Sequence, residues 1–453
     1  MVRYESVLES IGATPLIRLT RVTEGLRPRI YVKAEGQNPG GGVKDRAALS
    51  MLRQAEIDGS LRPGGTVVEA TSGNTGIGLA LVAAHLGYRT VIFTSSQIAE
   101  EKRAQIRAYG AEIRLVDAFV PRDHPDSLRS RAQQFVAETP GAWLAGQYDN
   151  PANPAAHRAT TGPEIWADTD GRVTHFVATV GTGGTISGTG RFLKTVSDGG
   201  VQVFGAEPAT SAYGGGDGSQ KYIEGAGHFV HPQATVDDWP QSLDTSVIDA
   251  YVGIEDQEAI DAIRHLARTE GILAGGSSGI ALAAALRIAQ NLDKHHTIVV
   301  LLPDSGRTYL STYFNETWLN INGFTRTTDA STTVGARVSP VRFVTATDSV
   351  PQATQRLTSQ GAGEQDVILV RHHRDGDRPS PHPSDVLGWT TVGELRAASN
   401  VTGDLRTVGA AFGAGLTITD PYVTAWDAAG DDLAVVLESG RVTGVVARKD
   451  LDR

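Results

Sequence analysis

Apolar runs and helical stretches alternate through the first 300 residues. Each run is rich in Val, Ile and other strand-forming residues, and a turn separates it from the stretch of helical periodicity that follows. The runs predict strands at 29–33, 66–70, 90–94, 112–116, 174–180 and 298–302, and the stretches predict helices at 77–86, 99–109, 186–193 and 280–289. This alternation predicts an α/β fold with a mostly parallel, buried sheet, in which ligands bind at the carboxyl ends of the strands.

A glycine-rich turn stands between the first of these strands and a helical pattern. It runs from Asn38 to Arg46 and contains the glycines Gly40–Gly42, with Lys44 close behind them. Glycines let a ligand approach the main chain, and a lysine at the start of a helix can act as an amine nucleophile towards carbonyl compounds. Taken alone, the motif is equally consistent with a flexible turn and a solvated lysine.

Three further glycine-rich turns open helices. Thr71–Gly76 and Gly181–Thr185 each follow a predicted strand, and Gly275–Gly279 opens a later helix. Backbone N–H groups at a helix start form an anion site suited to phosphate. The turn at 181–185 also resembles a dinucleotide fingerprint, with Glu207 in the place of the ribose-binding acid. That alternative leaves Lys44 without a role.

Residues in the later turns can be interpreted either as functional or as purely structural. Ser277 is well placed to be a helix N-cap. Asp304 and Ser305 follow a predicted buried strand and could equally be ordinary turn residues. The order of all the motifs, taken together, has to decide between these interpretations.

The composition narrows the class of protein. The chain has 453 residues, of which 40% are hydrophobic and 20% charged, as in a globular protein of two or three domains. A net charge of −10 disfavours nucleic acid or an anionic membrane as the main partner. The absence of cysteine excludes disulfides, thiolate-ligated haem and a cysteine nucleophile. No apolar run resembles a signal peptide or a membrane span, so we expect a cytoplasmic protein.

The order of the glycine-rich motifs along the chain is more specific for a protein family than any one motif alone. They read Gly-Gly-x-Val-Lys-Asp-Arg, Thr-Ser-Gly-Asn-Thr, Gly-Thr-Gly-Gly-Thr, Gly-Gly-Ser-Ser-Gly and Pro-Asp-Ser. Over residues 5–325 this order resembles the fold-type II pyridoxal-phosphate enzymes, in the branch that holds cysteine synthase and cystathionine β-synthase. The resemblance implies a core like the tryptophan synthase β chain, with two open-sheet subdomains, and it implies pyridoxal 5′-phosphate as the cofactor. We expect no haem cofactor.

The resemblance also implies roles for individual residues. Lys44 would form the Schiff base with the cofactor and move the substrate α-proton, Asn74 would bond the ring hydroxyl, and Ser277 would share the hydrogen bond of the ring nitrogen. A serine at that nitrogen, instead of an aspartate, favours prompt loss of a β-substituent over transamination. The remaining cofactor-binding residues are Gly181, Thr182, Gly183, Gly184, Thr185, Pro303 and Asp304. The substrate-binding residues are Thr71, Ser72, Thr75, Gln147, Tyr148 and Glu224, and no metal site is implied.

Three segments favour cystathionine β-synthase over cysteine synthase: Gln147–Asn150, Tyr222–Gly227 and Tyr313–Phe324. We therefore expect a lyase of transsulfuration that joins L-serine, or an activated serine, to homocysteine and gives cystathionine. Cysteine biosynthesis from O-acetylserine or O-phosphoserine and sulfide is the alternative. An alternative of another class is a non-catalytic regulatory or binding protein on the same scaffold. The expected partners are amino-acid and thiol substrates and further copies of the chain, as a homodimer or higher homo-oligomer.

The sequence departs from the family pattern at three places. Gly42 stands where a serine is usual, Ala13 stands where a Gly-Asn-Thr-Pro turn has asparagine, and Ser211–Gly216 is a glycine-rich, insertion-like loop. These departures bear on the second substrate more than on the cofactor.

The pattern changes after the expected catalytic core, 1–324. Residues 325–339 are rich in Thr, Ser, Ala and Arg and predict a linker, and 340–453 form a tail. The tail predicts strands at 341–344, 366–370, 386–389, 433–437 and 442–446 and a helix at 349–359, which suggests a repeat. It resembles a degenerate, Bateman-like pair of CBS domains, α/β in class. Because Glu394 and Ala447 replace groups that would hold a ribose, we expect regulation of the core without a strong adenosyl effect; scaffolding is the alternative.

A histidine-rich segment lies in the tail. His372 and His373 stand beside Asp375 and Asp377, with His382 nearby. Such a set could hold a metal ion, but a solvated polar loop is the simpler interpretation and the one we prefer.

Overall fold

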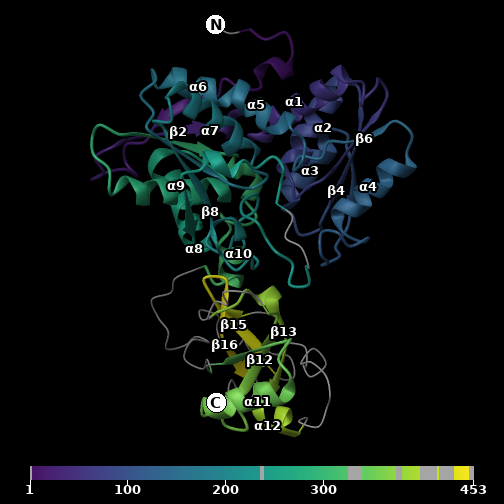
Figure 1. Cartoon of the computed structure of the whole chain (residues 1–453), viewed down its shortest axis with the longest axis vertical. Coiled ribbons are helices and arrows are strands. Elements are labelled where there is room, and N and C mark those ends of the chain that lie inside the picture. Colours follow the sequence, from purple (N-terminus) through teal and green to yellow (C-terminus); the bar gives the residue numbers. More distant parts are fainter. Residues whose placement is uncertain are drawn as a thin grey trace. The chain divides into compact units, whose positions relative to one another are not determined.

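The computed structural model describes residues 3–234, 239–324, 339, 341–373, 380–397, 416–417 and 433–447. The chain divides into two compact units (Figure 1). Residues 1–215 and 223–311 form the first unit, and residues 216–222 and 312–453 form the second. Most of the proposed linker lies outside the described residues. The proposed boundary at residue 324 falls inside the second unit, because residues 312–324 pack with 216–222.

The larger sheet of the first unit has the strand order β1-β2-β10-β7-β8-β9. Its strands are β1 (Leu16–Arg18), β2 (Arg29–Ala34), β7 (His175–Thr179), β8 (Gln202–Pro208), β9 (Ala250–Ile254) and β10 (Thr297–Leu302). β1 is antiparallel to β2, and the other neighbouring pairs are parallel. The carboxyl ends of β2, β10 and β7, which are adjacent, therefore meet at one edge.

The smaller sheet is parallel throughout and has the order β5-β4-β3-β6. Its strands are β3 (Thr66–Ala70), β4 (Arg89–Thr94), β5 (Glu112–Leu115) and β6 (Ala142–Leu144). All six residues of β10 and the first four of β3 are buried, as expected for parallel strands covered on both faces. The predicted α/β fold with two open, mostly parallel sheets is confirmed.

Helices pack between and around the sheets (Figure 1). They are α1 (Lys44–Ile57), α2 (Asn74–Leu86), α3 (Glu100–Ala108), α4 (Leu128–Glu138), α5 (Ala152–Ala159), α6 (Thr161–Asp168), α7 (Gly184–Val196), α8 (Asp256–Glu270) and α9 (Gly276–Ala289). Glycines bring two pairs of them into backbone contact. A Cβ at Gly78 of α2 would lie 3.0 Å from the Lys44 carbonyl oxygen of α1, and a Cβ at Gly188 of α7 would lie 2.1 Å from the Pro154 carbonyl oxygen of α5.

The turn before β1 contains a strained residue. Ala13 has φ +46°, in the left-handed region that residues other than glycine rarely adopt. Asparagine tolerates this region better, because its short polar side chain can hydrogen-bond locally. We expect Ala13→Asn to raise the free energy of unfolding by about 0.5–1 kcal/mol, measured by urea unfolding. Ala13→Val should lower it, because a β-branched side chain fits this region poorly. An unchanged or lowered stability of the asparagine variant would contradict the argument.

The second unit contains two three-stranded sheets. Its elements are α10 (Glu316–Ile321), β11 (Arg342–Thr345), α11 (Val350–Ser359), β12 (Val367–Arg371), β13 (Val386–Thr391), α12 (Val392–Ala397), β14 (Leu416–Thr417), β15 (Leu433–Glu438) and β16 (Arg441–Ala447). In each sheet the first strand is parallel to the second, and the second is antiparallel to the third. The register shifts at Val370/Arg371 in one sheet and at the corresponding Val436/Leu437 in the other. The predicted repeat is therefore confirmed in strand pairing.

An aromatic cluster joins distant segments within the second unit. The Tyr222 ring lies 5.1 Å from the Phe324 ring, 6.0 Å from the Trp318 ring and 4.7 Å from the His382 ring, between centroids. The Tyr313 hydroxyl donates to the Tyr222 carbonyl at 2.9 Å. The tail and the segment 216–222 are thus packed together.

The structure also bears on two expected absences. In the described part of the chain, no helix is both long and apolar enough to cross a membrane. Within the same residues, no three His, Asp or Glu side chains gather as metal ligands. Asp375 and Asp377 of the histidine-rich segment lie outside the described residues, so the interpretation of that segment stays a prediction.

Candidate active site

Lys44 is the first residue of α1 and lies at the carboxyl edge of the larger sheet. The turn before it is held to the turn after β10, where the Val43 N–H donates to the Pro303 carbonyl at 2.7 Å. Lys44 is only partly accessible to solvent. Its desolvation lowers the pKa of the ammonium to about 8, although the nearby Asp304 carboxylate opposes the shift. A larger fraction of this amine is therefore neutral, and able to accept a proton, than of an exposed lysine.

The glycines before Lys44 differ in how much room they have. A Cβ at Gly40 would lie 2.4 Å from Asp45 Oδ1, and the Gly40 N–H donates to Asp45 Oδ2 at 2.6 Å. A Cβ at Gly42 would lie 3.4 Å from the Pro303 carbonyl oxygen, an ordinary contact. Gly40 is thus required by packing, whereas the departure from serine at Gly42 does not result from crowding.

A buried ionic network lies beside Lys44. Arg46 donates through Nε to Glu35 at 2.7 Å and through Nη1 to Glu164 at 2.6 Å. Lys33 pairs with the same Glu164 at 2.8 Å. The side chains of Lys33, Glu35 and Arg46 are at most 2% exposed. Burial alone would raise the pKa of Glu164, but the hydrogen bonds from Arg46 and Lys33 lower it to about 2. This network, which sequence reasoning missed, anchors the first turn of α1.

The expected substrate-binding turn forms the N-terminus of α2. Thr71, Thr75 and Gln147 are buried, and Ser72 is exposed. The Thr75 hydroxyl donates to Gln147 Oε1 at 2.5 Å, so two residues 72 positions apart in the sequence meet here. Gly73 has φ +140°, which only glycine adopts readily. Hydroxyls, an amide and free N–H groups at a helix start together suit a carboxylate.

A chain of buried polar groups runs from this turn. Asn74 Nδ2 and the Tyr309 hydroxyl both donate to Asp304 Oδ2 at 2.6 Å. Lys102 Nζ donates to the Tyr309 hydroxyl at 2.9 Å and to Glu224 Oε2 at 2.6 Å. Burial raises the pKa of Asp304 despite the charge of Lys102 and these hydrogen bonds. Asp304 is 2% exposed and its carboxylate accepts two side-chain hydrogen bonds, which is unusual for a turn residue at the surface.

The third glycine turn connects β7 to α7. Gly183 has φ +86°, and a Cβ at Gly181 would lie 2.7 Å from the Gly225 carbonyl oxygen. A Cβ at Gly184 would lie 2.2 Å from Asn153 Oδ1. Glycine is therefore required at these three positions of the turn, and backbone N–H groups at the start of a helix suit an anion.

The two threonines of this turn are buried and have polar partners. Asn153 Nδ2 donates to Thr182 Oγ1 at 3.2 Å. Thr185 Oγ1 lies 3.3 Å from His157 Nε2, and His157 Nδ1 lies 2.9 Å from Thr161 Oγ1. Burial, reinforced by the charge of Lys44, holds the pKa of His157 well below its usual range. His157 is therefore a neutral support for Thr185, and neither Asn153 nor His157 was found from the sequence.

Ser277 is buried in the first turn of α9, but it is not the N-cap. The N-cap of α9 is Gly275, so the capping interpretation is wrong. Ser305, by contrast, does accept a hydrogen bond from the Arg307 N–H, as a turn residue does. Tyr148 is 37% exposed, and the Arg122 guanidinium lies 4.9 Å from its ring centroid. Its place beside Gln147 leaves it as a proposed substrate contact.

Glu207, which the dinucleotide alternative requires, cannot meet a ribose. It is 1% exposed at the end of β8, and a Cβ at Gly214 would lie 2.0 Å from Glu207 Oε1. A family comparison decides the matter. The family model of pyridoxal-phosphate dependent enzymes matches residues 7–304. The chain belongs to this family.

Curated relatives of this pyridoxal-phosphate dependent enzyme carry two names. Cystathionine beta-synthase of Apis mellifera is 41% identical over 320 residues, which cover 70% of this chain and 63% of the relative. Cysteine synthase 1 of Emericella nidulans is 40% identical over 325 residues, covering 70% and 86%. Cysteine synthase of Staphylococcus aureus is 39% identical over 311 residues, covering 68% and 96%. This chain thus spans less than two thirds of the bee relative.

Solved structures of other proteins are also similar to this enzyme in sequence and fold. O-ureido-L-serine synthase is 42% identical with a TM-score of 0.63, and the match covers 70% of this chain and 96% of that one. A hydrogen sulfide-producing enzyme of Fusobacterium nucleatum is 35% identical with a TM-score of 0.63, covering 68% and 100%.

The residues of the site fit pyridoxal phosphate. Lys44 supplies the amine, and the glycine turn before α7 supplies a crowded cradle of N–H groups for the phosphate. Asn153 Oδ1 and Asp304 Oδ1 are buried atoms without a hydrogen-bond partner among the described residues. Such atoms are expected where a ligand completes the site. The individual cofactor contacts of Asn74, Ser277 and Pro303 remain proposals.

Proposed function

We propose that this enzyme catalyses β-replacement on L-serine, or on an activated serine, with homocysteine as the incoming thiol and cystathionine as the product. The observation that carries the proposal is a linked set of contacts: Asn74 of the α2 turn donates to Asp304, which lies near Lys44. Asn153 donates to the Gln147 carbonyl and to Thr182 of the α7 turn. An amine, a carboxylate site and a phosphate cradle are the minimum set for chemistry at the α- and β-carbons of an amino acid.

Different residues of the site carry out different parts of the proposed reaction. When bound, pyridoxal phosphate supplies an electron sink for the carbanion that forms at the α-carbon. Lys44 Nζ accepts the α-proton and returns it at the end, and its lowered pKa favours the neutral amine that this needs. Thr75, Gln147 and the N-terminus of α2 hold the substrate carboxylate in one orientation. Hydroxide leaves serine only with the help of an acid, whereas acetate needs none.

The choice of homocysteine rests on a charged pair. Lys102 and Glu224 lie 2.6 Å apart and connect through Tyr309 to Asp304. Homocysteine carries an ammonium, which the partly exposed Glu224 carboxylate can recognise, and the buried Lys102 holds Glu224 in place. Sulfide has no ammonium and needs no such pair. The relatives named cysteine synthase keep the alternative of O-acetylserine or O-phosphoserine with sulfide open.

A parallel assay of the purified enzyme tests the proposal. One arm supplies L-serine and homocysteine, and the others supply O-acetylserine or O-phosphoserine with sulfide. We expect cystathionine in the first arm at the highest kcat/KM. Turnover confined to the sulfide arms would reverse the ranking. Absence of turnover in every arm, in protein that still binds a nucleotide, would favour the alternative of a regulatory protein on an inactive scaffold.

We further propose that the tail is a degenerate CBS pair that regulates the core. The aromatic cluster supports this, because Tyr222 packs against the tail residue His382 and stands two positions before Glu224 of the site. Glu394 of α12 stands at the ribose position of the first repeat, and its carboxylate is bonded to the end of β13: it accepts from Thr390 Oγ1 at 2.9 Å and from the Thr391 N–H at 2.8 Å.

An adenosyl ligand should therefore have little effect on the enzyme. A ligand changes activity only if it binds two states of the protein with different affinity, and the occupied Glu394 offers a ribose little. We expect no saturable heat and no rate change with S-adenosylmethionine in calorimetry and in the assay. Micromolar binding with a several-fold change in rate would show that the degenerate motif still works.

A further inference from the structure

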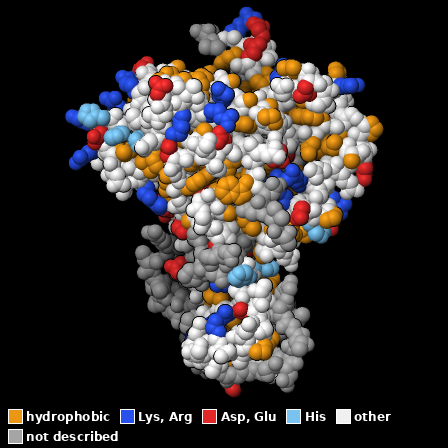
Figure 2. All heavy atoms as spheres, viewed as in Figure 1, with side chains coloured by type: hydrophobic (Ala, Val, Ile, Leu, Met, Phe, Trp, Pro, Cys, Tyr) orange, Lys and Arg blue, Asp and Glu red, His pale blue; other side chains and the backbone are white. Residues whose placement is uncertain are grey.

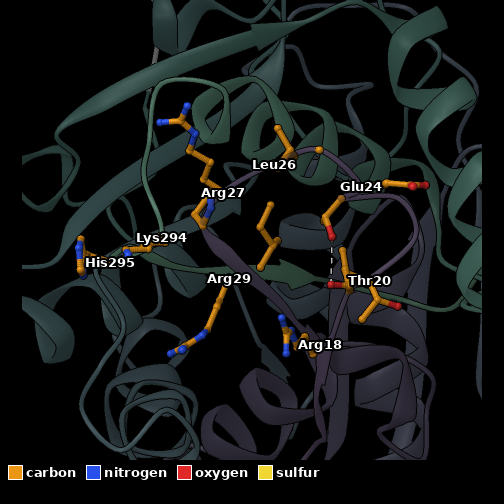
Figure 3. A pocket seen from close by; sticks show the side chains of 13 residues that line it. Arg18, Thr20, Glu24, Leu26, Arg27, Arg29, Lys294 and His295 are labelled. Carbon is orange, nitrogen blue, oxygen red and sulfur yellow. Dashed lines mark hydrogen bonds between the residues drawn. The ribbon is translucent and has the colours of Figure 1, made fainter.

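A basic hollow lies on the first unit, away from the catalytic turns. It has a volume of about 590 Å³ and is lined by residues 18–20 and 23–30, between the end of β1 and the start of β2, and by Lys294 and His295 (Figure 3). These segments lead into the amino ends of β2 and β10, whereas Lys44 and Asp304 follow their carboxyl ends. The hollow therefore cannot be part of the active site already described.

The charges of the hollow are unbalanced. Its basic residues are Arg18, Arg27, Arg29, Lys294 and His295, and Glu24 is its acidic residue. In the part of the chain that the structure describes, none of the basic side chains has a hydrogen bond or an ion pair, and all are exposed. Figure 3 shows Glu24 on the side opposite Lys294 and His295, and Figure 2 shows basic and histidine side chains gathered at the margin beyond α9.

Such a cluster is unusual in a chain with a net charge of −10. Four permanently positive side chains and one carboxylate line the hollow, and the repulsion among like charges is relieved only by screening or by a bound anion. The neighbouring acids are already engaged. Asp293 pairs with His296 at 2.8 Å, and Glu270 accepts backbone N–H bonds from Thr20, Arg21 and Val22.

The wall of the hollow is built before any ligand arrives. The three bonds to Glu270 are 2.5–3.0 Å long and fix the start of the 20–28 loop. The Thr23 hydroxyl donates to the Leu19 carbonyl at 3.0 Å, the bond drawn in Figure 3. The Arg29 N–H donates to the His296 carbonyl at 3.1 Å and ties the two walls together. A preformed wall lowers the entropy lost on binding.

The lining identifies the class of ligand. Arginine forks suit phosphate oxygens, and several cations call for several negative charges. Leu19, Pro28 and Ile30 also line the hollow but are buried, so the partly exposed Leu26 supplies its apolar contact for an organic group. A volume of this size suits a small organic molecule. We propose that the hollow is a second binding site, for a small organic polyphosphate of the nucleoside triphosphate type. This inference is independent of the proposed function.

Calorimetry of the full chain loaded with pyridoxal phosphate tests the proposal, because the cofactor then occupies the phosphate cradle of the active site. The probes are ATP, inorganic tripolyphosphate and adenosine. We expect ATP to bind, tripolyphosphate to compete with it, adenosine not to bind, and the affinity to fall as salt is added. S-adenosylmethionine, which carries no phosphate, should not compete.

Matched variants locate the site. Arg29→Gln combined with Lys294→Gln removes one cation from each wall and should weaken ATP binding about tenfold or more. Arg89→Gln is the control, because Arg89 is also exposed and also begins a parallel strand, β4 of the other sheet. It should change binding less than about twofold. No ATP binding by about 1 mM at low salt, an equal effect of the control, or unchanged binding in the double variant would each overturn the proposal.

Discussion

Lys44→Ala is expected to lose turnover by about a thousandfold or more, because it removes the group that moves the α-proton. The visible absorption band of the cofactor-loaded protein should shift or vanish in the same variant. Both are measured on purified protein, by the parallel assay and by absorption spectroscopy. A colourless wild-type protein, or full activity of the alanine variant, would contradict the role.

The variant Lys44→Arg tests whether activity requires proton transfer by Lys44 or only its positive charge. Arginine keeps the positive charge and nearly the same reach, but it stays protonated in proteins. If Lys44 acts by moving a proton, the arginine variant should be about as inactive as the alanine variant. Retained activity in Lys44→Arg would show that only the charge is needed.

The lowered pKa of Lys44 also has a consequence for stability. Its pKa falls from 10.5 to about 8 on folding, so between these values the unfolded chain binds the proton and the folded chain does not. The contribution of this group to the free energy of unfolding therefore rises with pH through that window. Cofactor-free Lys44→Ala should lack this rise, which urea unfolding at a series of pH values would show.

The second large effect is expected at Arg46. Arg46→Ala should lower the free energy of unfolding by about 3–5 kcal/mol, because it leaves the Glu35 and Glu164 carboxylates without their buried partner. Arg46 makes bonds of 2.6–2.8 Å to both of them, and the Glu35 side chain is fully buried. The change is measured by chemical unfolding of the wild type and the variant.

Arg53→Ala is the matched control on the same helix. Arg53 pairs with Glu56 at 2.8 Å but is 51% exposed, so its loss should change stability by less than about 1 kcal/mol. Adding Glu35→Gln to the Arg46 variant should recover part of the lost stability, since it removes an uncompensated buried charge. Equal effects of Arg46→Ala and Arg53→Ala would show that the buried network is not important for stability.

The sequence by itself determined the order of the elements and the turns that carry the chemistry. Five of the six residues of β10 form a contiguous apolar run. The positive φ angles at positions 73 and 183 are possible because both residues are glycine. Local pattern therefore placed Lys44, Asn74 and the 181–185 turn at strand ends, and parallel pairing brought those ends together.

Only the tertiary structure decided which side chains support these turns. Lys102 meets Tyr309 across 207 residues, and Arg46 meets Glu164 across 118. No local periodicity encodes such pairs, because each depends on two helices or turns packing at one place. The same reason explains why the alternative interpretation of Ser277 as an N-cap is wrong, since it depends on where α9 begins. It also explains the basic hollow. Its arginines are close together in the sequence, but Lys294 is far from them and joins them only because the amino ends of β2 and β10 lie side by side.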